Sequence, residues 1–265
     1  MRLRGWVAIF VLLWSAPAWV GTAWSGPETL PHGGEARVVA VVDGDTIVLN
    51  DRRQVRLVGI QAPKLPLGRT GFEPWPLSDE AKTHMSRLCQ GKAVHLRLPA
   101  RPQDRHGRVL AHVVADDGAW LQGEMLKAGL ARVYTFPDNR DLADELLALE
   151  RQARAERRGI WALPYYAPRT PENVAGDVGT FQIVEGWVRD AARVKKRIYL
   201  NFGADWRKDF TIAVDARHDQ AFLDAGIDLL RLRDQPIRVR GWVKSKNGPM
   251  IEVDHPERLE VLQTP

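Results

Sequence analysis

The sequence predicts a mainly β protein with added helices, in the α+β class, built as two small domains in succession. From residue 36 to about residue 160, short apolar and β-branched runs alternate with turn residues. The predicted elements of this region follow one another as strand, strand, strand, helix, strand, strand, helix, helix. A stretch rich in proline and glycine follows, and the strand pattern returns beyond it. A length of 265 residues also exceeds the roughly 100–200 residues of one typical domain.

The first domain begins with a predicted hairpin over residues 36–49. The dipeptide Asp43-Gly44 lies between two apolar, β-branched runs, which is a strong signal for a tight turn. Residues 61–75 are rich in Pro and Gly and are expected to form a loop. A helix is expected at 77–89, with Ser78 as its N-cap. By the same periodicities we expect strands at 54–60, 93–98 and 109–115, and helices at 120–128 and 142–158 that end at Gly129 and Gly159.

The second domain follows a Pro/Gly-rich linker. About five short strands and one helix suggest a second small β-barrel of the OB-like kind. The strands are expected at 181–189, 197–202, 210–214, 237–244, 250–253 and 259–262, and the helix at 220–230. The predicted organisation is therefore a leader at 1–25, a first domain at 36–162, a linker at 163–179 and a second domain at 180–263.

The first 25 residues have the order of a secretory signal peptide. Arg2 and Arg4 precede the apolar run 7–14, and small residues follow it. An uncleaved anchor is the alternative, although the run is shorter than the ~20 residues that cross a bilayer. We therefore expect an exported protein, periplasmic or secreted, with no stable membrane insertion once the leader is removed.

The charge balance is compatible with nucleic acid as a partner but does not specify it. The net charge is +5, and loss of the leader would leave 36 basic residues against 33 acidic ones, which is mildly basic. Cys89 is the single cysteine, so no internal disulfide forms, and its apolar surroundings predict a core residue.

Five short motifs occur in order within the first domain. They are Val-Asp-Gly-Asp-Thr (42–46), Arg-Leu-Val-Gly-Ile-Gln-Ala-Pro-Lys (56–64), Asp-Arg-His-Gly-Arg (104–108), Gly-Leu-Ala-Arg-Val-Tyr (129–134) and Arg-Gly-Ile-Trp (158–161). Together they resemble the staphylococcal nuclease, or thermonuclease, family. The resemblance implies an OB-type five-stranded barrel that carries three helices, in agreement with the element order.

The resemblance also implies a chemistry. In that family, a calcium ion and two arginines stabilise the transition state of phosphodiester cleavage, and a glutamate helps to activate water. Fixed cations are needed because the attacked phosphoryl group gains negative charge. Water needs a base or a metal before it becomes a good nucleophile.

Residue by residue, this chain matches that set only in part. Asp45 stands at the position of a metal carboxylate, and Arg56 and Arg108 stand at those of the phosphate-clamping arginines. Gln61 replaces the second metal carboxylate, and Lys64 replaces the glutamate. A glutamine carbonyl can still bind calcium, but weakly. A lysine removes the base and, at ~5 Å and an effective dielectric of ~20, repels a divalent ion by several kcal/mol.

We therefore expect an exported protein that binds nucleic acid or phosphate esters through Arg56, Lys64 and Arg108, with at most a weak calcium site at Asp45 and Gln61. Its catalytic site would be weak or inactive, and the sequence leaves open whether it is an enzyme. One alternative is an active endonuclease with altered metal dependence. Another is a structural or interaction protein of the cell envelope.

Other polar and aromatic residues have simpler interpretations. Asp43 is expected to serve the turn, and His106 to be a solvated loop residue. Tyr134 could stack on a base or pack in the core. In the second domain, aromatic residues alternate with basic ones, which suits either a surface for single-stranded nucleic acid or a small core.

Overall fold

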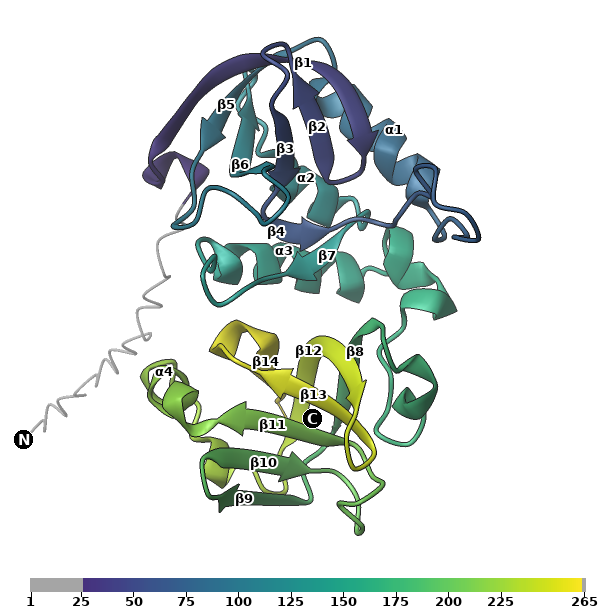
Figure 1. Ribbon diagram of the computed structural model, residues 1–265, viewed down its shortest axis with the longest axis vertical. Helices are drawn as coiled ribbons and strands as arrows, with labels where there is room; N and C mark the ends of the chain where they lie inside the picture. The colour runs from purple at the N-terminus through teal and green to yellow at the C-terminus, as the bar shows by residue number, and fades with distance from the viewer. Residues whose placement is uncertain (1–25, 264–265) are drawn as a thin grey trace, which may run out of the picture.

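The computed structural model describes residues 26–263, which form two domains stacked along the long axis of the molecule (Figure 1). The predicted signal peptide at 1–25 lies outside the described residues. Within residues 26–263, no helix combines the length and apolar character that a bilayer crossing needs.

The first domain contains a closed five-stranded barrel, as predicted. The strands pair in the order β1-β2-β3-β6-β5, and β5 pairs again with β1. Only the β3–β6 pair is parallel. The first half of β1 (residues 32–37) pairs with β5 and the second half (38–43) with β2, and each pairing contains a register shift. The barrel strands are β1 (His32–Asp43), β2 (Thr46–Leu49), β3 (Gln54–Leu57), β5 (Ala93–Arg97) and β6 (Val109–Ala115).

Three helices cover this barrel, as predicted. They are α1 (Ser78–Cys89), α2 (Leu121–Lys127) and α3 (Ala143–Ala155). The predicted N-cap of α1 is wrong: Ser78 is the first helical residue, and Leu77 precedes it in a left-handed conformation without a side-chain cap. Cys89 is buried in the barrel core, as expected.

The predicted strand at 54–60 is divided into β3 and β4 (Gly59–Gln61). Gly59 has a φ of +82°, and a Cβ there would lie 2.5 Å from Leu146 on α3. The chain therefore leaves the barrel at Gly59 and pairs with β7 (Arg132–Tyr134), where Gln61 is the register partner of Arg132. Neither short strand was predicted as a separate element.

The second domain, predicted as a small OB-like barrel, contains one seven-stranded mixed sheet. Its pairing runs β9-β10-β11-β13-β12-β8, and only β11–β13 is parallel. Val188 and Arg189 join β8 directly to β9 along the chain, and β14 pairs with the other edge of β12. The elements are β8 (Phe181–Trp187), β9 (Asp190–Val194), β10 (Arg197–Asn201), β11 (Thr211–Asp215), α4 (Asp219–Asp224), β12 (Pro236–Ser245), β13 (Pro249–Val253) and β14 (Leu259–Val261).

Each domain has its own hydrophobic core, and a small third cluster joins them. This cluster contains Trp161 and Tyr166 with Ile183 of β8. The Tyr166 hydroxyl donates to the carbonyl of Pro76 at 2.7 Å. The segment predicted as a linker thus carries short 3-10 helices at Pro164–Tyr166 and Val174–Asp177 and packs against both domains.

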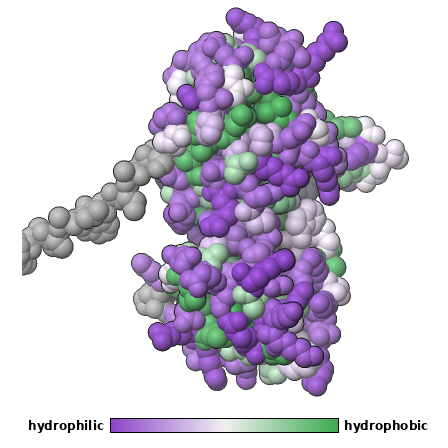
Figure 2. Space-filling model, turned by 60° about the vertical axis from the view of Figure 1, so that its left-hand side comes forward, coloured by the Kyte–Doolittle hydropathy of each residue, from purple (hydrophilic) through white to green (hydrophobic). Residues whose placement is uncertain are grey.

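A buried ion pair also joins the two domains. Arg240 of β12 donates to both carboxylate oxygens of Glu150 on α3, at 2.9 and 3.0 Å, and both side chains are fully buried. Glu150 also accepts from the backbone N–H of Val133 at 2.6 Å, and Arg240 reaches Glu260 at 2.8 Å. On the face that Figure 2 shows, the surface around the junction of the two domains is mostly hydrophilic. Directional polar contacts therefore set how β12 sits against the first domain.

Candidate nucleic-acid-binding site

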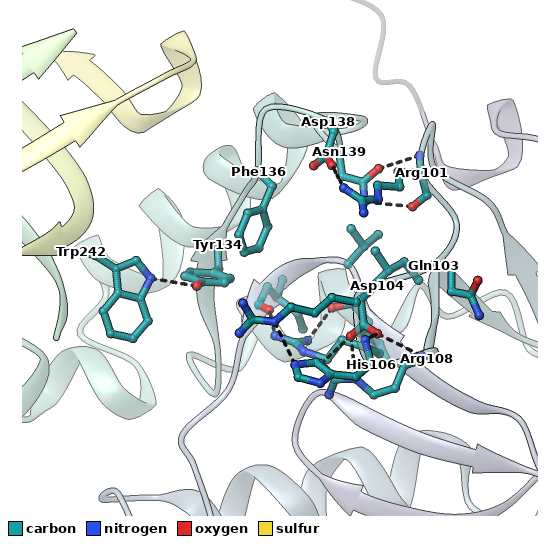
Figure 3. Close-up of a pocket in the computed structure, with 16 residues that line it drawn as sticks. Arg101, Gln103, Asp104, His106, Arg108, Tyr134, Phe136, Asp138, Asn139 and Trp242 are labelled. Carbon is teal, nitrogen blue, oxygen red and sulfur yellow. Dashed lines mark hydrogen bonds and ion pairs between the residues drawn. The ribbon is translucent and has the colours of Figure 1, made fainter. Parts of the chain in front are cut away.

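A cavity of about 560 Å³ lies between the first barrel and β12 (Figure 3). Four chain segments line it. They are the end of β3 with the turn after it (residues 56–60), the loop and strand start at 101–110, the end of β7 with its following loop (134–139), and Trp242 of β12. Four arginines and two aspartates occur among the lining residues, so its wall carries a net positive charge.

Arg56 is held rigidly at this wall. Its Nη1 donates to the carbonyls of Leu57 and Asp45, at 2.6 and 3.2 Å, and its Nη2 donates to the carbonyl of Ile60 at 2.6 Å. Nη2 also lies 3.2 Å from Oδ2 of Asp45. The side chain is 12% exposed. A guanidinium fixed in this way loses little entropy when it meets an anion.

Arg108 reaches the same cavity from the loop that ends the Asp-Arg-His-Gly-Arg motif. Its Nε and Nη2 each lie 2.8 Å from Oδ2 of Asp104, and 30% of its side chain is exposed. The other oxygen of Asp104 accepts from the backbone N–H groups of His106 and Arg108. Burial alone would raise the pKa of Asp104, but these hydrogen bonds hold it below its ordinary value. Asp104 therefore orients Arg108.

Lys64 lies against the predicted metal carboxylate. Its Nζ is 2.6 and 2.8 Å from the two carboxylate oxygens of Asp45 and 3.4 Å from Oδ2 of Asp43. Asp45 is fully buried, and the Lys64 side chain is 21% exposed. Burial would raise the pKa of Asp45, but Arg56 and Lys64 hold it well below its ordinary value. Burial and the neighbouring Asp45 raise the pKa of Asp43.

Gln61 has a different partner. Its side-chain oxygen accepts from Nε and Nη2 of Arg132, at 3.0 and 2.7 Å, inside the first domain. Burial lowers the pKa of Arg132 to about 10. The oxygen that could have bound a metal is therefore engaged by a guanidinium.

This donor set does not suit calcium, which needs six to eight oxygen ligands, several of them anionic. Both oxygens of Asp45 are within hydrogen-bond distance of the Lys64 ammonium, and the Gln61 oxygen is engaged elsewhere. In the part of the chain that the structure describes, no cluster of three or more His, Cys, Asp or Glu side chains has a geometry that could hold a metal ion.

Comparison with known proteins identifies the first domain. A family model described as staphylococcal nuclease homologue matches residues 54–163. A protein of Escherichia coli named as an uncharacterized endonuclease is 36% identical over 134 residues, which cover 49% of this chain and 77% of that protein. The chain belongs to the staphylococcal nuclease family.

Two further proteins similar to this chain come from eukaryotes. A probable staphylococcal-like nuclease of rice, Oryza sativa subsp. japonica, is 36% identical over 115 residues, or 43% of this chain and 30% of that protein. A probable endonuclease of the fungus Leptosphaeria maculans is 32% identical over 164 residues, or 54% of each chain. The family model ends at residue 163, before the second domain begins.

The structure brings together only some of the residues that the family resemblance singled out. Arg56 and Arg108 line one cavity. Lys64 is not among its lining residues, and its charge faces Asp43 and Asp45 instead.

Several contributors to this site in the staphylococcal nuclease domain were not found from the sequence. The role of Asp104 was missed, although its position in the Asp-Arg-His-Gly-Arg motif beside Arg108 could have indicated it. Tyr134, left open between stacking and packing, lines the cavity, and its ring is perpendicular to that of Phe136. No local signal marked Trp242, because its place depends on how the second domain docks.

Proposed function

We propose that this staphylococcal nuclease family member binds nucleic acid or related phosphate esters without a metal ion. It hydrolyses phosphodiesters weakly or not at all. The observation that carries the proposal is the Lys64 ammonium, which lies 2.6 and 2.8 Å from the oxygens of Asp45. A cation that belongs to the chain thus stands beside the carboxylate that would otherwise bind a metal.

The binding half of the proposal rests on two arginines at one cavity. Arg56 and Arg108 place two guanidinium charges beside one cavity, and these fixed charges attract a phosphodiester. The donors described above hold both groups in place through Asp45, backbone carbonyls and Asp104. Lys64 supports them indirectly, because it offsets the negative charge of Asp43 and Asp45 directly behind Arg56. That charge would otherwise weaken the attraction for a phosphate.

The proposal of weak catalysis rests on Lys64, which occupies the position of the family's glutamate. An ammonium group that is paired with two carboxylates cannot take a proton from water, so general-base catalysis from this position is lost. Asp45 could not readily replace it, because its lowered pKa makes it a poor base.

Binding of a fluorescently labelled oligonucleotide in EDTA tests the proposal. We expect binding that weakens steeply with salt, because counterion release drives it. Arg108→Ala should cost about 1–3 kcal/mol of binding free energy, the usual scale for a charged hydrogen-bond partner. Arg56→Ala should cost about as much, with its melting temperature checked because Arg56 also binds three backbone carbonyls. Arg217→Ala, an exposed arginine of the second domain, is the matched control. Rapid cleavage with calcium and no binding in EDTA would refute the proposal.

An active endonuclease with altered metal dependence is the second candidate. It is favoured by the endonuclease names of the Escherichia coli and Leptosphaeria maculans relatives, and by the presence of Asp45, Arg56 and Arg108. Gel assays of DNA and RNA with calcium, magnesium, manganese or zinc distinguish the two. Metal-dependent cleavage that Asp45→Asn abolishes would favour the enzyme.

We also propose that the protein is exported, on the basis of the basic, apolar and small-residue order within residues 1–25. Mass spectrometry of the protein from outside the cytoplasm should show a start between residues 19 and 26. Soluble cytoplasmic protein with Met1 intact would contradict export.

A further inference from the structure

The strand β12 turns alternate side chains toward the two domains. Ile237, Val239 and Val243 enter the core of the second domain. A Cβ at Gly241 would lie 2.5 Å from Ile251 in the same core. The side chains between these positions therefore face the opposite way, and among them Arg240 and Trp242 contact the first domain.

Trp242 is placed by contacts on both sides. Two residues before it, Arg240 is anchored by the buried Glu150. The indole N–H of Trp242 donates to the Tyr134 hydroxyl at 3.0 Å, and its ring meets that of Phe181 nearly edge-on. Although these contacts fix its orientation, 45% of Trp242 stays exposed.

The cavity therefore has two chemically different sides. Tyr134, Phe136 and Trp242 lie together on one side, and the loop that carries Arg108 lies across from them (Figure 3). The Tyr134 and Phe136 rings are perpendicular, with centroids 5.0 Å apart, and 43% of Phe136 is exposed. An aromatic side opposite a cationic side matches the base and the phosphate of one nucleotide unit.

We propose that the second domain completes the phosphate site with Trp242, which stacks on a base of single-stranded nucleic acid. The inference rests on the proposed function, since it needs a phosphate at Arg56 and Arg108. It assigns a role to a domain that lies beyond the family match. A single strand is favoured over a duplex, because only an unpaired, unstacked base can present its face to an indole ring.

The test measures binding of short labelled oligothymidine, oligouridine and a matched duplex to the full chain in EDTA. Wild type should prefer the single strands. Trp242→Ala should bind them at least about tenfold more weakly, the scale of a lost base–aromatic stack. Its salt dependence should stay unchanged, because no phosphate contact is removed. Arg108→Ala should instead reduce the salt slope by about one.

Two further variants separate stacking from structure. Trp187→Ala removes a tryptophan of the same domain that is 56% exposed and does not line the cavity, and it should bind like wild type. Trp242→Phe keeps an aromatic face and should retain most of the affinity. Equal losses in Trp242→Phe and Trp242→Ala would overturn the stacking role, because the hydrogen bond to Tyr134 would then be what matters.

The failure of this inference differs from failure of the proposed function. If Trp242→Ala binds like wild type while Arg108→Ala is weakened, the second domain has no part in binding and the phosphate site stands. If wild type binds no oligonucleotide in EDTA, both proposals are overturned.

Discussion

Replacing Lys64 by Met is the most direct perturbation of this site. Methionine keeps an unbranched stem of similar length and removes only the ammonium group. Asp43 and Asp45 would then remain buried with Arg56 as their only close cation among the residues described above. Because a buried charge without its partner is costly, the folded state should lose stability.

The magnitude follows from the distances. At the 2.6 Å separation of Nζ and Oδ2 of Asp45, and with an effective dielectric of about 20, the attraction is about 6 kcal/mol. Desolvation offsets much of this, and breaking buried pairs typically costs about 3–5 kcal/mol. Arg56 still faces Asp45 in the variant, and Lys64 is partly exposed. We therefore expect a loss of about 2–3 kcal/mol near neutral pH.

The loss should depend on pH in a definite direction. The pKa of Asp45 is lowered in the folded state, so its ionised form adds stability above its unfolded pKa of about 4. That contribution disappears as the pH falls toward the folded pKa. Because the unfolded state is alike in both proteins, the difference in unfolding free energy between wild type and Lys64→Met should be full at pH 7. It should shrink only as the pH falls toward the lowered folded pKa of Asp45.

Urea unfolding at several pH values measures this difference. Lys92→Met is the matched control, since Lys92 forms an exposed ion pair with Asp117 at 3.0 Å and should cost less than about 1 kcal/mol. The reasoning is refuted if Lys64→Met is as stable as wild type at pH 7. A difference that grows as the pH falls below 7 would refute the assignment to Asp45.

Two other predictions concern the metal and the domain junction. By calorimetry, the native chain should bind calcium with no better than millimolar affinity. The double variant Gln61→Asp and Lys64→Glu should bind calcium more tightly, and its binding of an oligonucleotide should depend on calcium. Micromolar calcium affinity of the native chain would contradict this prediction. Glu150→Gln should lower the unfolding free energy by about 2–4 kcal/mol, because its buried partner Arg240 would keep Glu260 as its one carboxylate among the contacts described here. Glu257→Gln, whose arginine partner at the same junction is exposed, should cost about 1 kcal/mol or less, and equal losses would count against the buried pair.

The larger elements could be predicted because their signals are local. The turn at Asp43-Gly44 and the helical spacing that ends at Cys89 depend on neighbouring residues alone. The short strands β4, β7 and β9 could not be predicted in this way. Each has only three to five residues, and its pairing partner rather than its composition defines it.

The site was predictable to the extent that chain motifs determine it. Arg56 and Arg108 were both expected at the phosphate position, and both line the same cavity. The sequence also showed that Lys64 adds a positive charge, but not which groups would face it. That depends on how the loop after β4 folds back over the β1–β2 turn, which brings Lys64 to Asp45.

The role of Trp242 could not be predicted from the sequence, for a different reason. Its contribution depends on the docking of two domains, which the buried pair of Arg240 and Glu150 helps to set. Neither residue carries a local signal for a partner so distant in the chain. The alternation along β12 does predict that Arg240 and Trp242 share a face, but not that this face meets Tyr134.

The electrostatics of the site explain how a lysine outside the cavity can still matter to a ligand within it. The lining residues carry four arginines against two aspartates, while Asp43 and Asp45 lie directly behind Arg56. Without Lys64, those two carboxylates would cancel the positive excess of the lining. With it, one positive charge remains, which matches the single negative charge of a phosphodiester. The chain itself thus supplies, in smaller measure, the charge that a metal would have supplied, and this balance underlies the proposal that the site holds a phosphate rather than cleaves it.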